Sequence, residues 1–145
     1  MVSVQNYPQI IGSKQSLYAM KIKSTPLCSF CNQENESIMH LLYECRHIKE
    51  MLEKLIEWLN TNTNNNILLN KADYILGSHD QYALNMIYLF TKAYVYEFKL
   101  KSEISNFDSL KFKILSEIKV LKYIHTKNDT LQIFRNQRYK YEFLM

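Results

Sequence analysis

Cys28-Ser29-Phe30-Cys31, with His40 and Cys45 after it, is the stretch that decides the fold of this 145-residue chain. Its spacing is C-x2-C-x8-H-x4-C, and it uses all 3 cysteines of the sequence. A Cys-x2-Cys turn directs two thiolates toward one ion, and zinc takes four sulfur and nitrogen ligands in a tetrahedron. The pattern therefore predicts one zinc ion bound by Cys28, Cys31, His40 and Cys45.

The predicted zinc has a structural role. Four protein ligands fill its coordination sphere and leave no position for an activated water. The alternative is that the cysteines are small buried apolar residues and that His40 is a hydrogen-bonded core histidine. His47, two residues beyond Cys45, is a competing ligand. We favour His40 because His47 is expected to start the next helix and to face elsewhere.

The composition favours helices. The chain is 47% hydrophobic, which is enough for one domain with a core, and has only 2 glycines and 2 prolines. So few turn-forming residues argue against a β-sandwich or barrel. The predicted fold class is all-α: a small helical domain with a CCHC zinc-pinned corner near its N-terminal side.

The cysteine count and the hydropathy pattern also bear on the compartment. An odd number of cysteines does not make a disulfide framework, which indicates reduced thiols. No segment approaches the ~20 apolar residues of a membrane span, and the N-terminus lacks the layout of a signal peptide. We expect an intracellular protein of the cytoplasm or nucleus with no membrane partner.

Ser37 is a good N-cap for the turn that presents His40. Helical periodicity is clear from Ile48 onward, and Trp58 near the end of this helix is expected to cover the core. Glu50 and Lys54 form a possible i, i+4 ion pair. The polar segment 61–66 is expected to be a loop. The apolar positions of the amphipathic helix are Ile48, Met51, Leu52, Leu55, Ile56 and Leu59.

The second half predicts two long helices and a short one. Residues 81–101 are apolar almost all round, so this helix should be the central buried one. Its narrow polar strip is Asn85, Tyr88, Lys92 and Lys99. Asn106 can cap the next helix, and Thr130 can cap a last one with Leu131 and Phe134. The apolar stripe after Asn106 is Phe107, Leu110, Ile114, Ile118, Leu121 and Ile124.

These elements group into three regions. Residues 1–23 have little pattern and read as an N-terminal arm that docks on an upstream domain. Residues 24–60 hold the zinc motif and the amphipathic helix. Residues 67–145 form the helical core and a basic tail, packed with the zinc part as one domain.

The net charge of +4 is concentrated in the second half. Residues 1–91 have seven Lys and Arg against eight Asp and Glu, whereas residues 92–145 have eleven against six. A basic half with interleaved tyrosines favours RNA or DNA as a partner, although a solvated helical face explains it equally well. The candidate phosphate contacts are Lys111, Lys119, Lys122, Arg135, Arg138 and Lys140.

Several stretches together resemble the C-terminal zinc-binding region of LINE-type non-LTR retrotransposon reverse transcriptases. They are Leu27-Cys28-Ser29-Phe30-Cys31, then Glu36-Ser37-Ile38-Met39-His40-Leu41-Leu42-Tyr43-Glu44-Cys45 with Trp58, and more weakly Ile75-Leu76-Gly77, Thr91-Lys92-Ala93-Tyr94-Val95-Tyr96 and Lys122-Tyr123-Ile124 before Asn128. The resemblance implies a domain that follows a polymerase and positions element RNA or target DNA. It also implies that Cys28, Cys31, His40 and Cys45 are the zinc ligands.

The chain lacks the Asp-Asp pair that would hold the two metals of nucleotide transfer, so the polymerase chemistry of that family does not carry over. We predict a non-enzymatic, zinc-stabilised nucleic-acid-binding domain. The alternative is a structural domain without nucleic-acid contact, which docks on a polymerase domain through its N-terminal segment and the far face of residues 107–127.

Overall fold

The computed structural model describes residues 12–133, and this part of the chain is helical. Its pairing of extended backbone is limited to one isolated antiparallel bridge between Leu27 and Asn35. The predicted all-α class is confirmed. The elements are α1 (Lys14–Ala19), the π-helical turn η2 (His40–Glu44), α2 (Arg46–Thr63), α3 (Lys71–Leu76), α4 (Tyr82–Lys101) and α5 (Phe107–Lys127).

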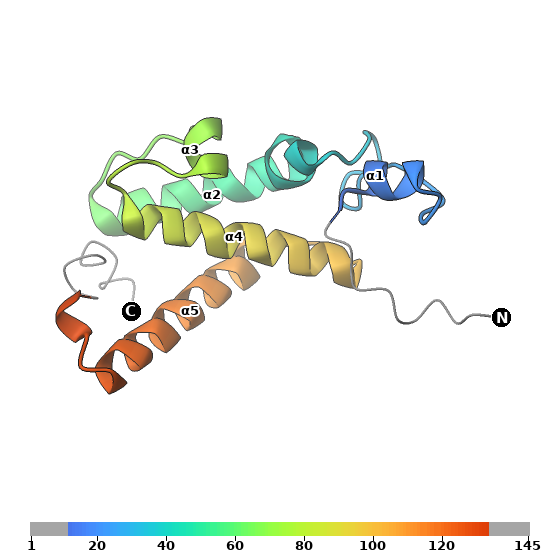
Figure 1. Ribbon diagram of the computed structural model, residues 1–145. Helices are drawn as coiled ribbons and strands as arrows, with labels where there is room; N and C mark the ends of the chain where they lie inside the picture. The colour runs from blue at the N-terminus through green and yellow to red at the C-terminus, as the bar shows by residue number, and fades with distance from the viewer. Residues whose placement is uncertain (1–11, 134–145) are drawn as a thin grey trace.

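Helix α4 occupies the centre of the arrangement (Figure 1). It contacts α3, α5 and η2, while α5 also contacts α2. In the view of Figure 1, α2 and α4 run in opposite directions, and α5 diverges from α4 toward its own C-terminal end. The central position predicted for residues 81–101 is confirmed, and the helix begins within one residue of the expected start.

Helix α2 packs as its periodicity predicts. The six apolar positions of the predicted stripe are all buried, and Glu50, Glu53 and Glu57 lie on the exposed side. Trp58 is half-buried and meets Phe107 edge to face, with ring centroids 6.3 Å apart. Glu50 does not pair with Lys54. It accepts a hydrogen bond from Arg46 Nε at 3.1 Å, one turn earlier.

The loop predicted from residue 61 begins later, because α2 continues to Thr63. Thr61 and Asn62 donate side-chain hydrogen bonds to the carbonyls of Glu57 and Trp58, at 2.8 and 2.7 Å. These polar side chains bond back onto the helix instead of leaving it. Asn64 then ends α2 in the left-handed conformation, with φ 49°.

Two members of the predicted polar strip of α4 are buried, which corrects that prediction. Tyr88 is fully enclosed and packs edge to face on Tyr74, at a centroid distance of 5.1 Å. Lys99 is buried because its ammonium group meets a buried carboxylate from the metal corner. A helical wheel cannot reveal such a partner, since it treats a lysine as a solvent-facing residue.

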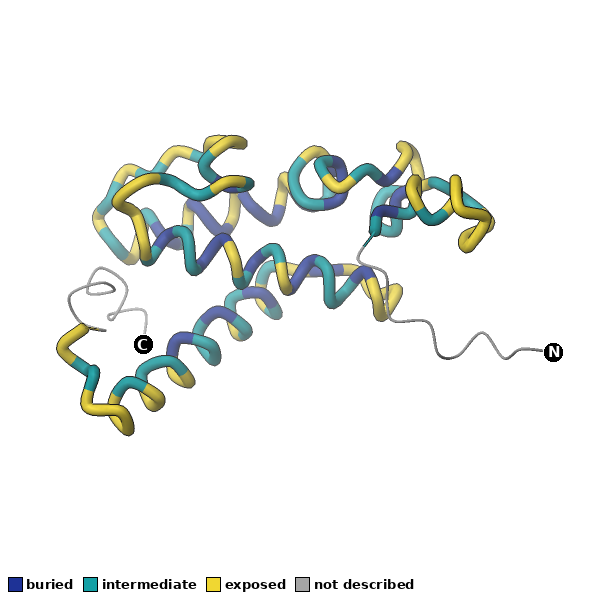
Figure 2. The backbone as a smooth tube through the Cα atoms, in the orientation of Figure 1, coloured by how far each residue is buried: buried dark blue, intermediate teal, exposed yellow. Residues whose placement is uncertain are grey.

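Helix α5 begins as predicted: the Asn106 side chain accepts a hydrogen bond from Ser109 N at 2.9 Å. Leu110, Ile114 and Ile118 are buried, but the stripe becomes more exposed toward Ile124. Figure 2 shows the same change along the tube. The stripe loses its cover because α5 leaves α4 at this end (Figure 1).

The ends of the chain limit two other predictions. Residues 131–133 are helical after Thr130, whereas Phe134 and the rest of the tail lie outside the described residues. The described part of the proposed N-terminal arm, including α1, contacts the metal corner of its own chain.

None of the helices within residues 12–133 combines the length and apolar content that crossing a bilayer requires.

Candidate metal centre

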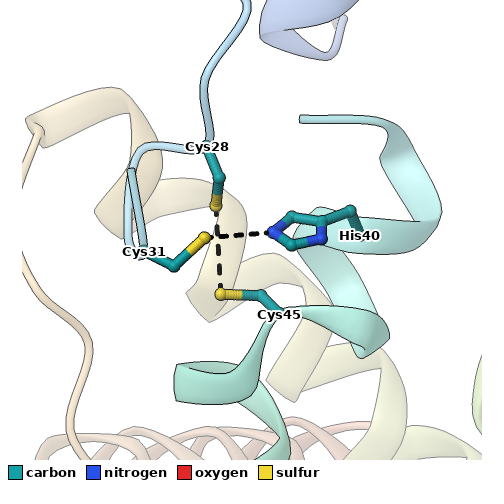
Figure 3. A group of neighbouring side chains, drawn as sticks. All are labelled: Cys28, Cys31, His40 and Cys45. Atoms are coloured by element: carbon teal, nitrogen blue, oxygen red, sulfur yellow. Dashed lines mark hydrogen bonds between the residues drawn. The ribbon is translucent and has the colours of Figure 1, made fainter. Parts of the chain in front are cut away.

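A tight loop presents the first two potential ligands. The Leu27–Asn35 bridge closes it, and Cys28 N donates to Glu34 O at 2.8 Å. Inside the loop, Asn32 N donates to Cys28 O at 3.0 Å, and Asn32 adopts a left-handed φ of 53° that asparagine tolerates well. The backbone therefore turns between Cys28 and Cys31 and directs both sulfurs to one side (Figure 3).

A π-helical turn presents the second pair. Ser37 Oγ accepts from His40 N at 3.0 Å, which confirms the predicted N-cap. Cys45 N then donates to His40 O at 2.8 Å, an i to i+5 bond rather than the i to i+4 bond of an α-helix. Five residues of an α-helix would turn Cys45 well away from His40. The wider π turn, followed by the extended ψ of 127° at Cys45, brings both side chains to the same site.

The four potential ligand atoms lie within 4.8 Å of one another, close enough to hold a metal ion. The distance from Cys28 Sγ to Cys45 Sγ is 3.9 Å, and the distance from Cys31 Sγ to His40 Nε2 is 3.4 Å (Figure 3). A zinc tetrahedron with bonds of about 2.3 Å to sulfur and 2.0–2.1 Å to nitrogen has edges of about 3.8 Å for sulfur–sulfur and 3.6 Å for sulfur–nitrogen. The donor set fits an ion of this size with small adjustments.

The geometry assigns His40, rather than His47, to the cluster. His40 directs Nε2 at Cys31, while its Nδ1 lies 3.5 Å from the Glu34 carboxylate. Such a carboxylate partner favours the tautomer with hydrogen on Nδ1 and leaves Nε2 free to bind a metal. His47 instead places Nε2 2.8 Å from Ser105 O.

Local hydrogen bonding prepares the two buried thiols to act as a pair. Without a metal, the pKa of Cys28 is raised because its thiol donates to Cys45 and because it is buried. The pKa of Cys45 is lowered, first by that same hydrogen bond from Cys28 and then by the backbone N–H groups of Ile48 and His47. The Cys28 thiol lies 3.9 Å from the Cys45 sulfur, and a cation bound between them would take the place of the thiol proton.

Buried Glu36 fixes the same corner to the helical body. It accepts from Ser29 N at 2.9 Å, Ser29 Oγ at 2.7 Å and Lys14 N at 2.8 Å, and its Oε1 lies 2.8 Å from Lys99 Nζ. Lys99 also donates to Gly12 O. This buried ion pair therefore joins the cysteine loop and the N-terminal segment to α4.

The Glu36–Lys99 pair was not predicted from the sequence. In the sequence, Glu36 stands in the segment that resembles the retrotransposon region and Lys99 in the predicted polar strip, and each has hydrophilic neighbours along the chain. A separation of 63 positions cannot be bridged by local periodicity.

Three of the six residues predicted to bind nucleic acid, Lys111, Lys119 and Lys122, lie on α5. Lys111 is half-buried, and its ammonium group lies over the Trp58 ring, 5.6 Å from the ring centroid. Lys119 is exposed, and Lys122 is half-buried on the same helix. Arg135, Arg138 and Lys140 lie outside the described residues.

Comparison of the chain with protein-family models, with curated proteins and with solved structures finds no match. The resemblance to retrotransposon reverse transcriptases therefore rests on the residues quoted for it and stays a prediction.

Proposed function

We propose that this chain is a zinc-stabilised nucleic-acid-binding domain. The observation that carries the metal part is the convergence of three sulfurs and one imidazole nitrogen within 4.8 Å. Soft thiolates with an imidazole in a tetrahedral set favour zinc over magnesium or calcium, which prefer oxygen. When bound, the ion would supply a cross-link between the cysteine loop, η2 and the start of α2.

The free energy of zinc binding is large compared with the stability of a domain, so this cross-link is important for folding. Zinc binding by finger-sized peptides is worth about 10–16 kcal/mol at neutral pH, whereas a whole domain is stable by only about 5–15 kcal/mol. The loop 24–36 has little regular structure of its own. We expect this loop to lose order when the metal is removed, together with the N-terminal segment that donates hydrogen bonds to Glu36.

The nucleic-acid part of the proposal rests on the positive charge of α5. Between Phe107 and Lys127, α5 has five lysines against one aspartate and one glutamate, and that glutamate, Glu117, pairs with Lys113 at 3.1 Å. A cationic helix on the surface attracts phosphates and gives binding that weakens with salt. The resemblance to the retrotransposon region points to element RNA or target DNA, with a polymerase domain as a further partner.

The proposed role is non-catalytic. Four protein ligands would leave the metal no open position for water. His79 is exposed and its Nδ1 lies 3.0 Å from the Asp80 carboxylate, and His125 Nδ1 lies 2.7 Å from Thr130 Oγ1. Reduced thiolates are needed for the site, so the proposal places the chain in a reducing compartment.

The test joins metal content to binding. Protein purified in reducing buffer should contain one zinc per chain, and a chelator should lower its helical circular dichroism signal. Labelled RNA and DNA should bind more weakly as salt rises from about 50 to 200 mM, with a linear relation between log K and log salt. A chain without zinc, or an affinity that does not change with salt, would contradict the proposal.

A protein-docking role is the second candidate, and a separate observation favours it. Met20 and Ile22 are exposed just after α1, and Leu76 is exposed at the end of α3. Apolar residues left in solvent are typical of surfaces that contact another protein. Under this reading, zinc is bound but no salt-dependent nucleic-acid binding is measured.

A further inference from the structure

The outer face of α5 combines two aromatic rings with two lysines. It consists of Phe112, Lys119, Tyr123 and Lys127, and all four are exposed. At 100° per residue they fall within about 80° of the helix circumference, directly opposite the buried stripe of Leu110, Ile114 and Ile118. This outer face is therefore turned away from the core.

The two aromatic rings on this face are unusually open. Phe112 is 74% exposed and Tyr123 is 63% exposed, although each has a large apolar surface that prefers to be covered. Neither ring takes part in the core cluster of the described residues. Since isolated exposed apolar residues are common, exposure alone does not identify a ligand.

The lysines decide what kind of ligand fits. Lys127 Nζ lies 5.6 Å from the centroid of the Tyr123 ring, and Lys119 lies one turn from the same ring. From Phe112 to Lys127 the one acidic residue is Glu117, which points to another side of the helix and pairs with Lys113. From Phe112 onward the outer face thus presents flat rings beside positive charge, while the carboxylate of Asp108 lies one turn before Phe112, at the N-terminal end of α5. An anionic ligand with aromatic groups complements it.

We propose that the outer face of α5 binds a single-stranded segment of RNA or DNA, with Phe112 and Tyr123 stacking on unpaired bases and Lys119 and Lys127 contacting phosphates. The proposal rests on the nucleic-acid function proposed above and specifies its ligand and its surface. Bases of a duplex are stacked on each other and do not offer their faces to a ring, whereas those of a single strand do.

The spacing sets the direction of the strand. Phe112 and Tyr123 are eleven residues apart, which corresponds to about 16 Å along the helix axis. The two rings therefore cannot contact neighbouring bases of a compact stack. The strand would run along α5, past Lys119 between the rings, and would contact Lys127 at the C-terminal end.

The experiment uses the full zinc-loaded chain and fluorescence anisotropy with oligothymidine and oligouridine of about 12 nucleotides, a length within the site sizes of single-strand binders. A mixed-sequence duplex of equal length is the comparison. The test variant is Phe112→Leu with Tyr123→Leu, which keeps apolar bulk but removes both rings. Tyr18→Leu is the matched control, since Tyr18 is an exposed tyrosine of α1.

A second pair of variants tests the charge. Lys119→Glu changes the outer face, and Lys54→Glu makes the same change in net charge on the exposed side of α2. We expect the double aromatic variant to bind single strands about fivefold more weakly or worse, since one stacked base contributes ~1–3 kcal/mol. Lys119→Glu should weaken binding and flatten the salt dependence, and both controls should bind like the original chain.

The outcomes separate this proposal from the one on which it rests. If the original chain binds no nucleic acid, the proposed function fails and this inference with it. If it binds, but the aromatic variant binds equally well or the duplex binds as tightly as the single strands, only the outer-face proposal is overturned. If the aromatic variant dissociates a dimer in sedimentation runs and leaves oligonucleotide binding unchanged, the outer face is a protein contact and the proposal is also overturned.

Discussion

At the scale of single residues, the choice between two histidines shows how orientation selects a ligand. His40 and His47 flank Cys45, and both are close enough in sequence to serve. Only His40 directs a ring nitrogen at the sulfurs. His47 lies against Phe30, with ring centroids 6.2 Å apart, and meets the Ser105 carbonyl.

This difference predicts opposite behaviour of two alanine variants. His40→Ala should weaken zinc binding by more than the ~10–100-fold that loss of a supporting residue costs, because a ligand itself is removed. His47→Ala should keep one zinc per chain and lose about 1 kcal/mol of stability with its hydrogen bond. Competition titration against a chromophoric chelator measures both. A zinc-free His47→Ala protein would contradict the assignment.

Glu34 is a second residue whose role is measurable. Its carboxylate lies 3.5 Å from His40 Nδ1 but is 75% exposed, so it orients the imidazole only loosely. We expect Glu34→Ala to weaken zinc binding at the lower end of the ~10–100-fold range of such partners. Glu53→Ala, an exposed glutamate of α2, is the control and should change nothing. The same chelator titration applies.

At the scale of elements, the x4 spacing between His40 and Cys45 acquires its meaning from η2. In a regular α-helix these side chains would diverge, and the i to i+5 turn makes them converge. Deleting Leu42 would leave three residues between His40 and Cys45, which is the i, i+4 spacing of an α-helix. The residues of the turn after the deletion would then face other directions. The length of this turn is therefore part of the metal site.

Helix α5 offers a test of its N-cap. Asn106 Oδ1 accepts from Ser109 N, while the backbone of Asn106 exchanges hydrogen bonds with Tyr94 Oη. Asn106→Ala removes only the side-chain bond and should cost about 1 kcal/mol in urea unfolding. Asn106→Asp should cost much less, because aspartate caps well and its charge suits a helix N-terminus. An equal loss of unfolding free energy in both variants would show that the side-chain hydrogen bond of the N-cap is not the cause.

At the scale of the whole molecule, the Glu36–Lys99 pair joins parts that are distant in sequence. Glu36→Gln should destabilise the protein by about 3–5 kcal/mol, because it leaves the buried Lys99 charge without its partner. Adding Lys99→Met to Glu36→Gln should restore much of this loss, since a flexible apolar side chain then fills the space. Urea unfolding of the zinc-loaded proteins at neutral pH measures both. If the double variant is no more stable than Glu36→Gln, the buried charge is not the cause.

Acid should act through the same carboxylate. Burial raises the pKa of Glu36, but hydrogen bonds from Lys99, Ser29 and Lys14 outweigh burial and hold the pKa below its usual value. A depressed pKa adds stability above the unfolded value of about 4.3, and this stability disappears as pH falls through the folded pKa. The stability difference between the original chain and Glu36→Gln should thus be constant above about pH 5 and shrink in more acidic buffer. A gap that persists or widens in acid would contradict the assignment.

The helical class, the buried stripe of α2, the N-caps Ser37 and Asn106, and the four potential metal ligands could all be predicted from the sequence. Each of these depends on residues within a few turns of one another, where periodicity and ligand spacing are explicit. Tertiary structure alone decided three things: that Tyr88 and Lys99 are buried, that the apolar stripe of α5 loses its cover, and that His47 turns to Ser105. The physical reason is that burial of a polar group depends on a partner from a distant part of the chain, as Glu36 is for Lys99, and no local pattern specifies that partner.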